Sequence, residues 1–153
     1  MLKALCDVLR ETGDHLVQWR ESSEANAGHW EGTQFKAKAD QWSHDLLSRG
    51  LQKMDPGIPI VSEESPWPAS SATHYWLIDP IDGTASYAQG FKGYVTQAAL
   101  MENNRPRLAV VYAPAEGKLL AAERGGGSTL NGAPFQVLPP PRSAASNFPS
   151  AGA

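Results

Sequence analysis

The first 54 residues carry apolar side chains at the spacing of an amphipathic helix. Over residues 2–19, charged and polar residues separate the apolar positions Leu2, Leu5, Leu9, Leu16 and Trp19, which places these five on one helical face. The pattern returns over 40–54, where Asp40 stands at the position of an N-cap and Asp55-Pro56-Gly57 ends the segment. The sequence therefore predicts two helices, with a polar loop over 21–32 between them.

After residue 57 the pattern changes to short apolar runs of strand length. These runs occupy residues 58–61, 75–78, 95–101, 108–112 and 119–122. The links between the last three runs have hairpin length and are rich in turn-forming residues. Two helices followed by such strands predict an α+β fold with a mainly antiparallel sheet.

The end of the chain differs in composition from the rest. Of the 16 residues over 138–153, 12 are Pro, Ala, Ser or Gly. Such a segment buries too little apolar surface to offset the conformational entropy that it would lose on folding. We therefore expect one folded part over 1–137 and a Pro/Ala/Ser-rich tail over 138–153.

Charge and cysteine content narrow the classes of function. The net charge is −3 and no segment gathers five or six basic residues, which argues against binding to the phosphate backbone of nucleic acids. The single cysteine, Cys6, excludes an intrachain disulfide. The chain shows neither a signal-peptide pattern nor an apolar run of about 18 residues. We expect a cytoplasmic protein with no nucleic-acid or membrane partner, in which a phosphorylated ligand would need a cation.

Three acidic clusters carry the candidate chemistry: Asp40, Glu63-Glu64, and the two aspartates within 79–84. Two of the clusters directly follow strand-like runs, so their carboxylates are expected to project into one crevice. Carboxylates that share a crevice repel each other unless cations neutralise them, and Mg²⁺ is the first candidate because it prefers oxygen ligands. Each cluster alone is typical of an N-cap, a solvated loop or a turn, but their order after the strands favours a metal site.

The segment 79–84 has the local chemistry for such a site. Pro80 disfavours a helical conformation of Asp79, so a tight turn here can direct the carboxylates of Asp79 and Asp82 at one ion. The carbonyl of Ile81 lies between them in sequence. Gly83-Thr84 then offers backbone N–H groups at the start of a predicted helix, which favours binding of an anion.

Residues 76–84, Trp-Leu-Ile-Asp-Pro-Ile-Asp-Gly-Thr, resemble the signature of the inositol monophosphatase family, W-[IL]-[IV]-D-P-[IL]-D-G-T. Residues 61–65 are similar to its G/S-E-E segment, and 38–40 resemble its T-x-x-D segment, with Ala37 where threonine is usual. Residues 125–132 match its G-x-G-A-x-x-N-G turn. The resemblance covers residues 2 to about 137 and implies the N-terminal half of that family's layered α/β sandwich.

The resemblance also implies hydrolysis of a phosphomonoester with two or more Mg²⁺ ions, Mn²⁺ being the alternative. One ion would be bound by Glu63, Asp79 and the Ile81 carbonyl oxygen. A second ion would share Asp79 and add Asp82, as in other two-metal sites.

Three catalytic residues are implied in the same way: Asp40, Glu63 and Thr84. The Thr84 hydroxyl, paired with Asp40, would orient the attacking water and help to deprotonate it. The phosphate would be bound by Asp82, Gly83 and Thr84.

Two branches of the family are candidates for the substrate. His44 follows Asp40 by four residues, and Ala99-Leu100 precedes Val-Val-Tyr-Ala-Pro at 110–114. Both features favour the 3'(2'),5'-bisphosphate nucleotidases, which remove a phosphate from adenosine 3',5'-bisphosphate. The residues at 85–87, Ala-Ser-Tyr, match neither the K-E-F of that branch nor the T-N-F of the inositol phosphatases. Hydrolysis of inositol 1-phosphate or a sugar phosphate is therefore the alternative.

The 153 residues lack the W-D-x-x-A-G segment that completes the second metal site in the family, and no Trp-Asp dipeptide occurs. They also lack the half of the fold that contacts the rest of the substrate. This leaves a hypothesis of a different class, a catalytically incomplete fragment that binds metal or phosphate. Besides a small phosphorylated substrate, we expect a second copy of the chain or a C-terminal half as partner.

Overall fold

The computed structural model describes residues 1–22, 32–62 and 72–136. The helices are α1 (Leu2–Glu21), α3 (Gly32–Met54) and α4 (Thr84–Ala88), with a short 3-10 helix η1 (Pro114–Glu116). The strands are β1 (Ile60–Ser62), β2 (His74–Asp82), β3 (Val95–Glu102), β4 (Arg105–Ala113), β5 (Lys118–Glu123), β6 (Gly127–Leu130) and β7 (Ala133–Pro134). None of the described helices is long and apolar enough to cross a membrane.

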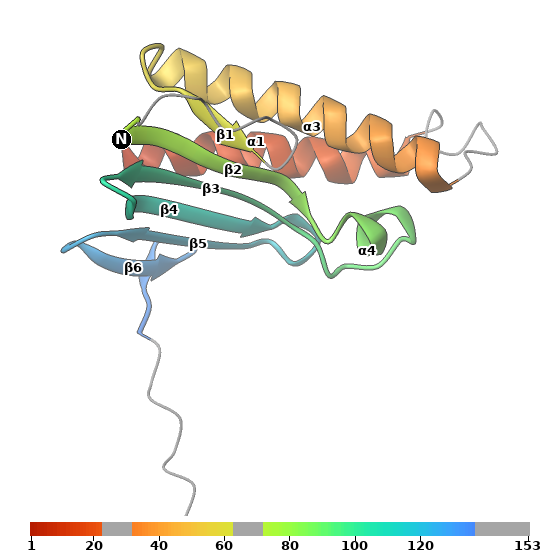
Figure 1. The fold of residues 1–153 in the computed structure, drawn as a ribbon. Coiled ribbons are helices and arrows are strands. Elements are labelled where there is room, and N and C mark those ends of the chain that lie inside the picture. The colour runs from red at the N-terminus through yellow and green to blue at the C-terminus, as the bar shows by residue number, and fades with distance from the viewer. Residues whose placement is uncertain (23–31, 63–71, 137–153) are drawn as a thin grey trace, which may run out of the picture.

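All seven strands form one sheet in the order of the chain, β1-β2-β3-β4-β5-β6-β7. Only β1 and β2 are parallel, and every other neighbouring pair is antiparallel. Both long helices lie on one face of this sheet (Figure 1). The predicted α+β fold with a mainly antiparallel sheet is confirmed.

The second helix begins earlier than the sequence predicted. It starts at Gly32, so Asp40 lies inside α3 and is not its N-cap. The residues just before Asp40 contain no helix breaker, and Ala39 is fully buried, so packing continues towards the N-terminus. Ser43 stays within the helix by donating its hydroxyl hydrogen bond to the Ala39 carbonyl oxygen at 2.7 Å. Of the predicted loop over 21–32, residues 23–31 lie outside the described part.

Strand β2 is also longer than predicted, because it continues past Pro80 to Asp82. A β-bulge makes this possible. Asp79 pairs with Gln97 and Asp82 pairs with Val95, so three steps on β2 match two steps on β3. Proline has no N–H for a regular ladder, and a bulge is one of the places where a strand tolerates it.

The inner face of the sheet packs against α1 and α3. Each leucine that is fully buried in this way contributes about 1.5–3 kcal/mol of transfer free energy. The main core cluster consists of Leu5, Leu9, Leu47, Leu51, Trp76, Ile78, Ala98, Leu100, Leu108, Val110, Tyr112, Leu119 and Ala121. A second cluster, which we call the turn cluster, consists of Leu16, Ala39, Ile81, Tyr87 and Tyr94.

The opposite face of the sheet is covered by no described helix or strand (Figure 1). Because side chains alternate along a strand, it carries the intervening residues, and Leu77 and Leu120 are 39% and 38% exposed. An open hollow of about 440 Å³ lies on this face. We call it the outer face and define it by Leu77, Asp79, Gln97, Ala99, Ala109, Val111 and Leu120.

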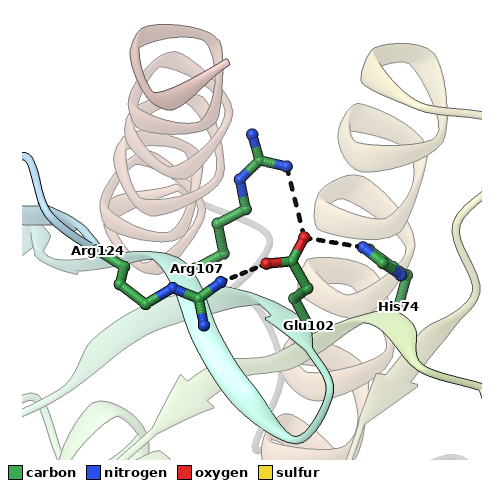
Figure 2. A network of polar contacts seen from close by, with 4 residues as sticks. All are labelled: His74, Glu102, Arg107 and Arg124. Atoms are coloured by element: carbon green, nitrogen blue, oxygen red, sulfur yellow. Dashed lines mark hydrogen bonds and ion pairs between the residues drawn. The ribbon is translucent and has the colours of Figure 1, made fainter.

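A polar network joins strands β2, β3 and β4 to Arg124, the residue directly after β5, at one end of the sheet (Figure 2). Glu102, at the end of β3, accepts a hydrogen bond from His74 Nε2 at 3.0 Å and pairs with Arg124. Arg107 Nη1 lies 3.9 Å from the same carboxylate. The hydrogen bond with His74, and then the charges of Arg124 and Arg107, hold the pKa of Glu102 below its ordinary value.

This network predicts acid sensitivity. Because the pKa of Glu102 is lower in the folded state than in the unfolded state, its contribution to stability is present above pH 4.5 and is lost as the pH falls below that value. Thermal unfolding between pH 7 and pH 3 should show a smaller loss of Tm in Glu102→Gln than in wild type. Glu123→Gln, at the end of β5 in the same sheet, is the control and should follow the wild-type curve. Parallel curves for wild type and Glu102→Gln would contradict this role.

Candidate functional site

The sequence-predicted site begins on the outer face, at the edge of the hollow. Asp79 lies there, half-buried, together with Ser62 of the parallel strand β1 and Gln97 of β3. Strand β1 ends at Ser62, which is beside Ile78 in the register. The end of β1 and the carboxylate-bearing part of β2 are therefore neighbours.

The bulge in β2 turns Asp82 to the same side as Asp79. Their partners on β3, Val95 and Gln97, are two residues apart and so share one face. The amide of Gln97 donates a hydrogen bond from Nε2 to Asp82 Oδ2 at 3.1 Å. Gln97 was not predicted from the sequence, because only the pairing register places it opposite Asp79.

The chain then turns sharply into α4. Gly83 has a left-handed backbone with φ of +90°, a conformation that glycine adopts without steric cost. Thr84 is the first residue of α4, and its hydroxyl donates a hydrogen bond to the Ile81 carbonyl oxygen at 2.9 Å. N–H groups in the first turn of a helix have no acceptor within the helix, so this turn presents donors beside the carboxylates.

Asp40 lies on α3, directly after a residue that packs against the turn. Its neighbour Ala39 packs in the turn cluster with Ile81 and Tyr87, and the Asp40 side chain is half-buried. The acceptor of the Thr84 hydroxyl is the Ile81 carbonyl oxygen, so the expected pairing of Thr84 with Asp40 stays a prediction.

The second acidic cluster, Glu63-Glu64, lies outside the described residues, so the role of Glu63 also stays a prediction. One residue earlier, the Ser62 hydroxyl lies 3.3 Å from Nδ1 of His44 on α3. This contact joins the end of β1 to the helix that carries Asp40.

The oxygen atoms at the turn are of the kind that Mg²⁺ binds. Asp79 and Asp82 supply carboxylates, and the Ile81 carbonyl has a second lone pair beside its bond with Thr84. Within 1–22, 32–62 and 72–136, no three side chains of Asp, Glu, His or Cys come together as a metal site. The described donors therefore fit part of a magnesium site, which would need at least one further ligand.

Comparison with known proteins supports the resemblance found in the sequence. The inositol monophosphatase family model matches residues 1–152. The chain is 32% identical over 137 residues to the 3'(2'),5'-bisphosphate nucleotidase CysQ of Salmonella typhimurium, covering 82% of this chain and 56% of that protein. It is 37% identical over 100 residues to the histidinol-phosphatase of Chlorobaculum parvum, covering 65% of this chain and 39% of that protein. The chain thus spans about half the length of the nucleotidase.

The fold agrees with this assignment. The extragenic suppressor protein SuhB of Bartonella henselae superposes with a TM-score of 0.75 at 23% identity, covering 88% of this chain and 52% of that one. The inositol monophosphatase of Thermotoga maritima gives a TM-score of 0.69 at 28% identity, covering 87% and 52%. Family match, signature residues and fold coincide on the same segment, and the chain belongs to the inositol monophosphatase family.

Proposed function

We propose that this chain carries the metal- and phosphate-binding part of a Mg²⁺-dependent phosphomonoesterase. The observation that carries the proposal is the end of β2. There a bulge brings Asp79 and Asp82 to one face, and the Gly83 turn and the start of α4 follow at once. Carboxylates for a cation and N–H donors for an anion are thus adjacent, as phosphoryl transfer requires.

The metal would be held by Asp79, Asp82, the Ile81 carbonyl oxygen and Glu63, with Mn²⁺ as an alternative to Mg²⁺. When bound, it would supply Lewis acidity that polarises the phosphoryl group and lowers the pKa of a water molecule. Gln97 holds one oxygen of Asp82, which leaves the other oxygen for the cation.

Thr84 would orient the attacking water. The proton of its hydroxyl is directed at the Ile81 carbonyl oxygen, so the lone pairs of Thr84 Oγ1 can accept a hydrogen bond from that water. Asp40, which follows Ala39 on α3, is the candidate to receive the water's proton. The N–H groups of Gly83 and Thr84 would bind the phosphate oxygens.

Two observations support a bisphosphate nucleotide, such as adenosine 3',5'-bisphosphate, as the substrate. The nucleotidase CysQ is similar over 82% of the chain, and His44, the residue that points to that branch, contacts the end of β1 through Ser62. Inositol 1-phosphate or a sugar phosphate is the second candidate, since the fold also matches inositol monophosphatases. The alternative to both substrates is that the chain binds metal or phosphate but does not catalyse hydrolysis.

Replacement of Thr84 tests the proposed chemistry. In a form completed by the C-terminal half of a relative fused near Val137, Thr84→Ala should lower kcat by roughly 10²–10⁴-fold, the range for lost acid–base assistance. Thr84→Ser keeps the hydroxyl and should retain most of the activity. Release of inorganic phosphate in the presence of Mg²⁺ is the measurement. Equal rates for Thr84→Ala and wild type would leave Thr84 with a role in the turn alone.

A further inference from the structure

The turn that offers N–H groups to the phosphate rests on the backbone of the strand that follows it. A Cβ atom at Gly83 would lie 2.6 Å from the Gly93 carbonyl oxygen and 3.2 Å from the Cα of Tyr94. Gly83 is therefore in direct contact with these two residues. The direction of its N–H depends on where Tyr94 is held.

Tyr94 is held by a partner ring from α4. The rings of Tyr87 and Tyr94 meet edge to face, with centroids 4.9 Å apart and an interplanar angle of 72°, a geometry that aromatic pairs prefer. Both residues are almost completely buried. Tyr87 also donates its backbone N–H to the Gly83 carbonyl oxygen at 3.0 Å. Gly83 thus contacts the backbone of Tyr94 and accepts a hydrogen bond from the backbone of Tyr87, the two residues of the ring pair.

The ring pair is fixed to α1. The guanidinium carbon of Arg20 lies 5.4 Å from the centroid of Tyr87 and 5.2 Å from that of Tyr94. Arg20 Nη1 donates a hydrogen bond to the Phe91 carbonyl oxygen at 3.0 Å, and the Tyr87 hydroxyl donates one to the Leu16 carbonyl oxygen at 2.8 Å. Burial raises the pKa of both phenols, so they stay neutral and attract the cation through their π-faces.

We propose that Arg20 is a positioning residue for the phosphate-binding turn. It acts through the Tyr87–Tyr94 pair and the Phe91 carbonyl, which occupy its guanidinium group, and it does not touch the phosphate. The inference rests on the proposed function of the Gly83–Thr84 turn. It assigns to α1, far from the signature in sequence, a part in fixing the N–H donors.

Hydrogen–deuterium exchange of the 153-residue chain, read by mass spectrometry on the peptide that covers 83–88, tests this role. Arg20→Met keeps the apolar stem and removes the cation, so exchange in this peptide should become about tenfold faster. In the presence of Mg²⁺, inorganic phosphate should slow exchange of this peptide. The phosphate concentration that gives half of the maximal slowing should be about tenfold higher in Arg20→Met than in wild type. Unchanged exchange of 83–88 in Arg20→Met would overturn the proposal.

Tyr112→Phe is the matched control. It removes another bond to α1, the hydrogen bond from the Tyr112 hydroxyl to Asp14 Oδ1 at 2.7 Å, and should leave 83–88 as in wild type. An equal rise of the exchange rate of 83–88 in Tyr112→Phe and Arg20→Met would mean that Arg20 only stabilises the fold in general, and it would overturn the proposal.

If Arg20→Met does not fold, Arg20→Lys is measured in its place. A lysine ammonium cannot stack on two rings as a planar guanidinium does, so exchange should rise about threefold, and a wild-type rate would overturn the proposal. If phosphate does not protect 83–88 even in wild type, the proposed function fails. The comparison without phosphate still decides whether Arg20 holds the turn.

Discussion

The 153-residue chain on its own should self-associate at micromolar concentration. Its outer face exposes Leu77, which lines an open hollow, and Leu120 on the adjoining strand β5, and no described element covers this face. Exposed apolar patches of several hundred Å² are typical of surfaces that bind a partner or aggregate. Light scattering behind size-exclusion chromatography should give a mass of at least twice 16.5 kDa.

Charged substitutions on the outer face identify the surface responsible. Leu77→Lys and Leu120→Lys should each raise the dissociation constant of self-association by at least about tenfold, and so favour the monomer. Phe91→Lys is the control, because Phe91 is 60% exposed but lies outside this face. A monomer in the wild type, or an equal effect of all three substitutions, would contradict the assignment. We also expect that a C-terminal half of a relative, fused near Val137, restores the monodisperse state by covering this face.

The second large effect concerns the cation. Mg²⁺, Mn²⁺ or Ca²⁺ should raise the Tm of the wild-type chain, because a ligand that binds only the folded state stabilises it by about 2.7 kcal/mol at a concentration of 100 Kd. Asp79→Asn should abolish most of this rise, since it removes a carboxylate and preserves the shape of the side chain. Differential scanning fluorimetry over a series of metal concentrations measures the rise of Tm in wild type and in Asp79→Asn.

A surface aspartate provides the control for this experiment. Asp7→Asn removes a carboxylate that pairs with Arg10 at 3.7 Å on the exposed side of α1. It should leave the metal-dependent rise as in wild type. Equal rises in wild type and Asp79→Asn would remove Asp79 from the metal site.

Hydrophobic periodicity was sufficient to predict most of the fold. The apolar face of 2–19 is confirmed as α1, and the run at 95–101 became β3 within one residue. These elements could be predicted because the same alternation that patterns the sequence decides which side chains are buried. The start of α3 was predicted too late, because Asp40 is a favoured N-cap residue and a buried Ala39 is a weak signal in the sequence.

The candidate site was only partly predictable. The signature at 76–84 indicated the carboxylates and the turn, which are local features. The bulge that brings Asp79 and Asp82 to one face depends on pairing with β3, and the same pairing supplies Gln97. The contact of Arg20 with the two tyrosines joins residues about 70 positions apart. No local pattern contains such long-range contacts.

Phosphate release by a fusion of this chain with the C-terminal half of a relative tests the central claim most directly. The chain, fused near Val137 to the C-terminal half of a nucleotidase relative, should be assayed with adenosine 3',5'-bisphosphate, inositol 1-phosphate and sugar phosphates, with and without Mg²⁺. We expect Mg²⁺-dependent release at an ordinary enzyme rate, roughly 1–10³ s⁻¹, fastest with the bisphosphate nucleotide and lost in Asp79→Asn. A soluble, monomeric fusion that releases no more phosphate than its Asp79→Asn variant from any of these substrates would contradict the account.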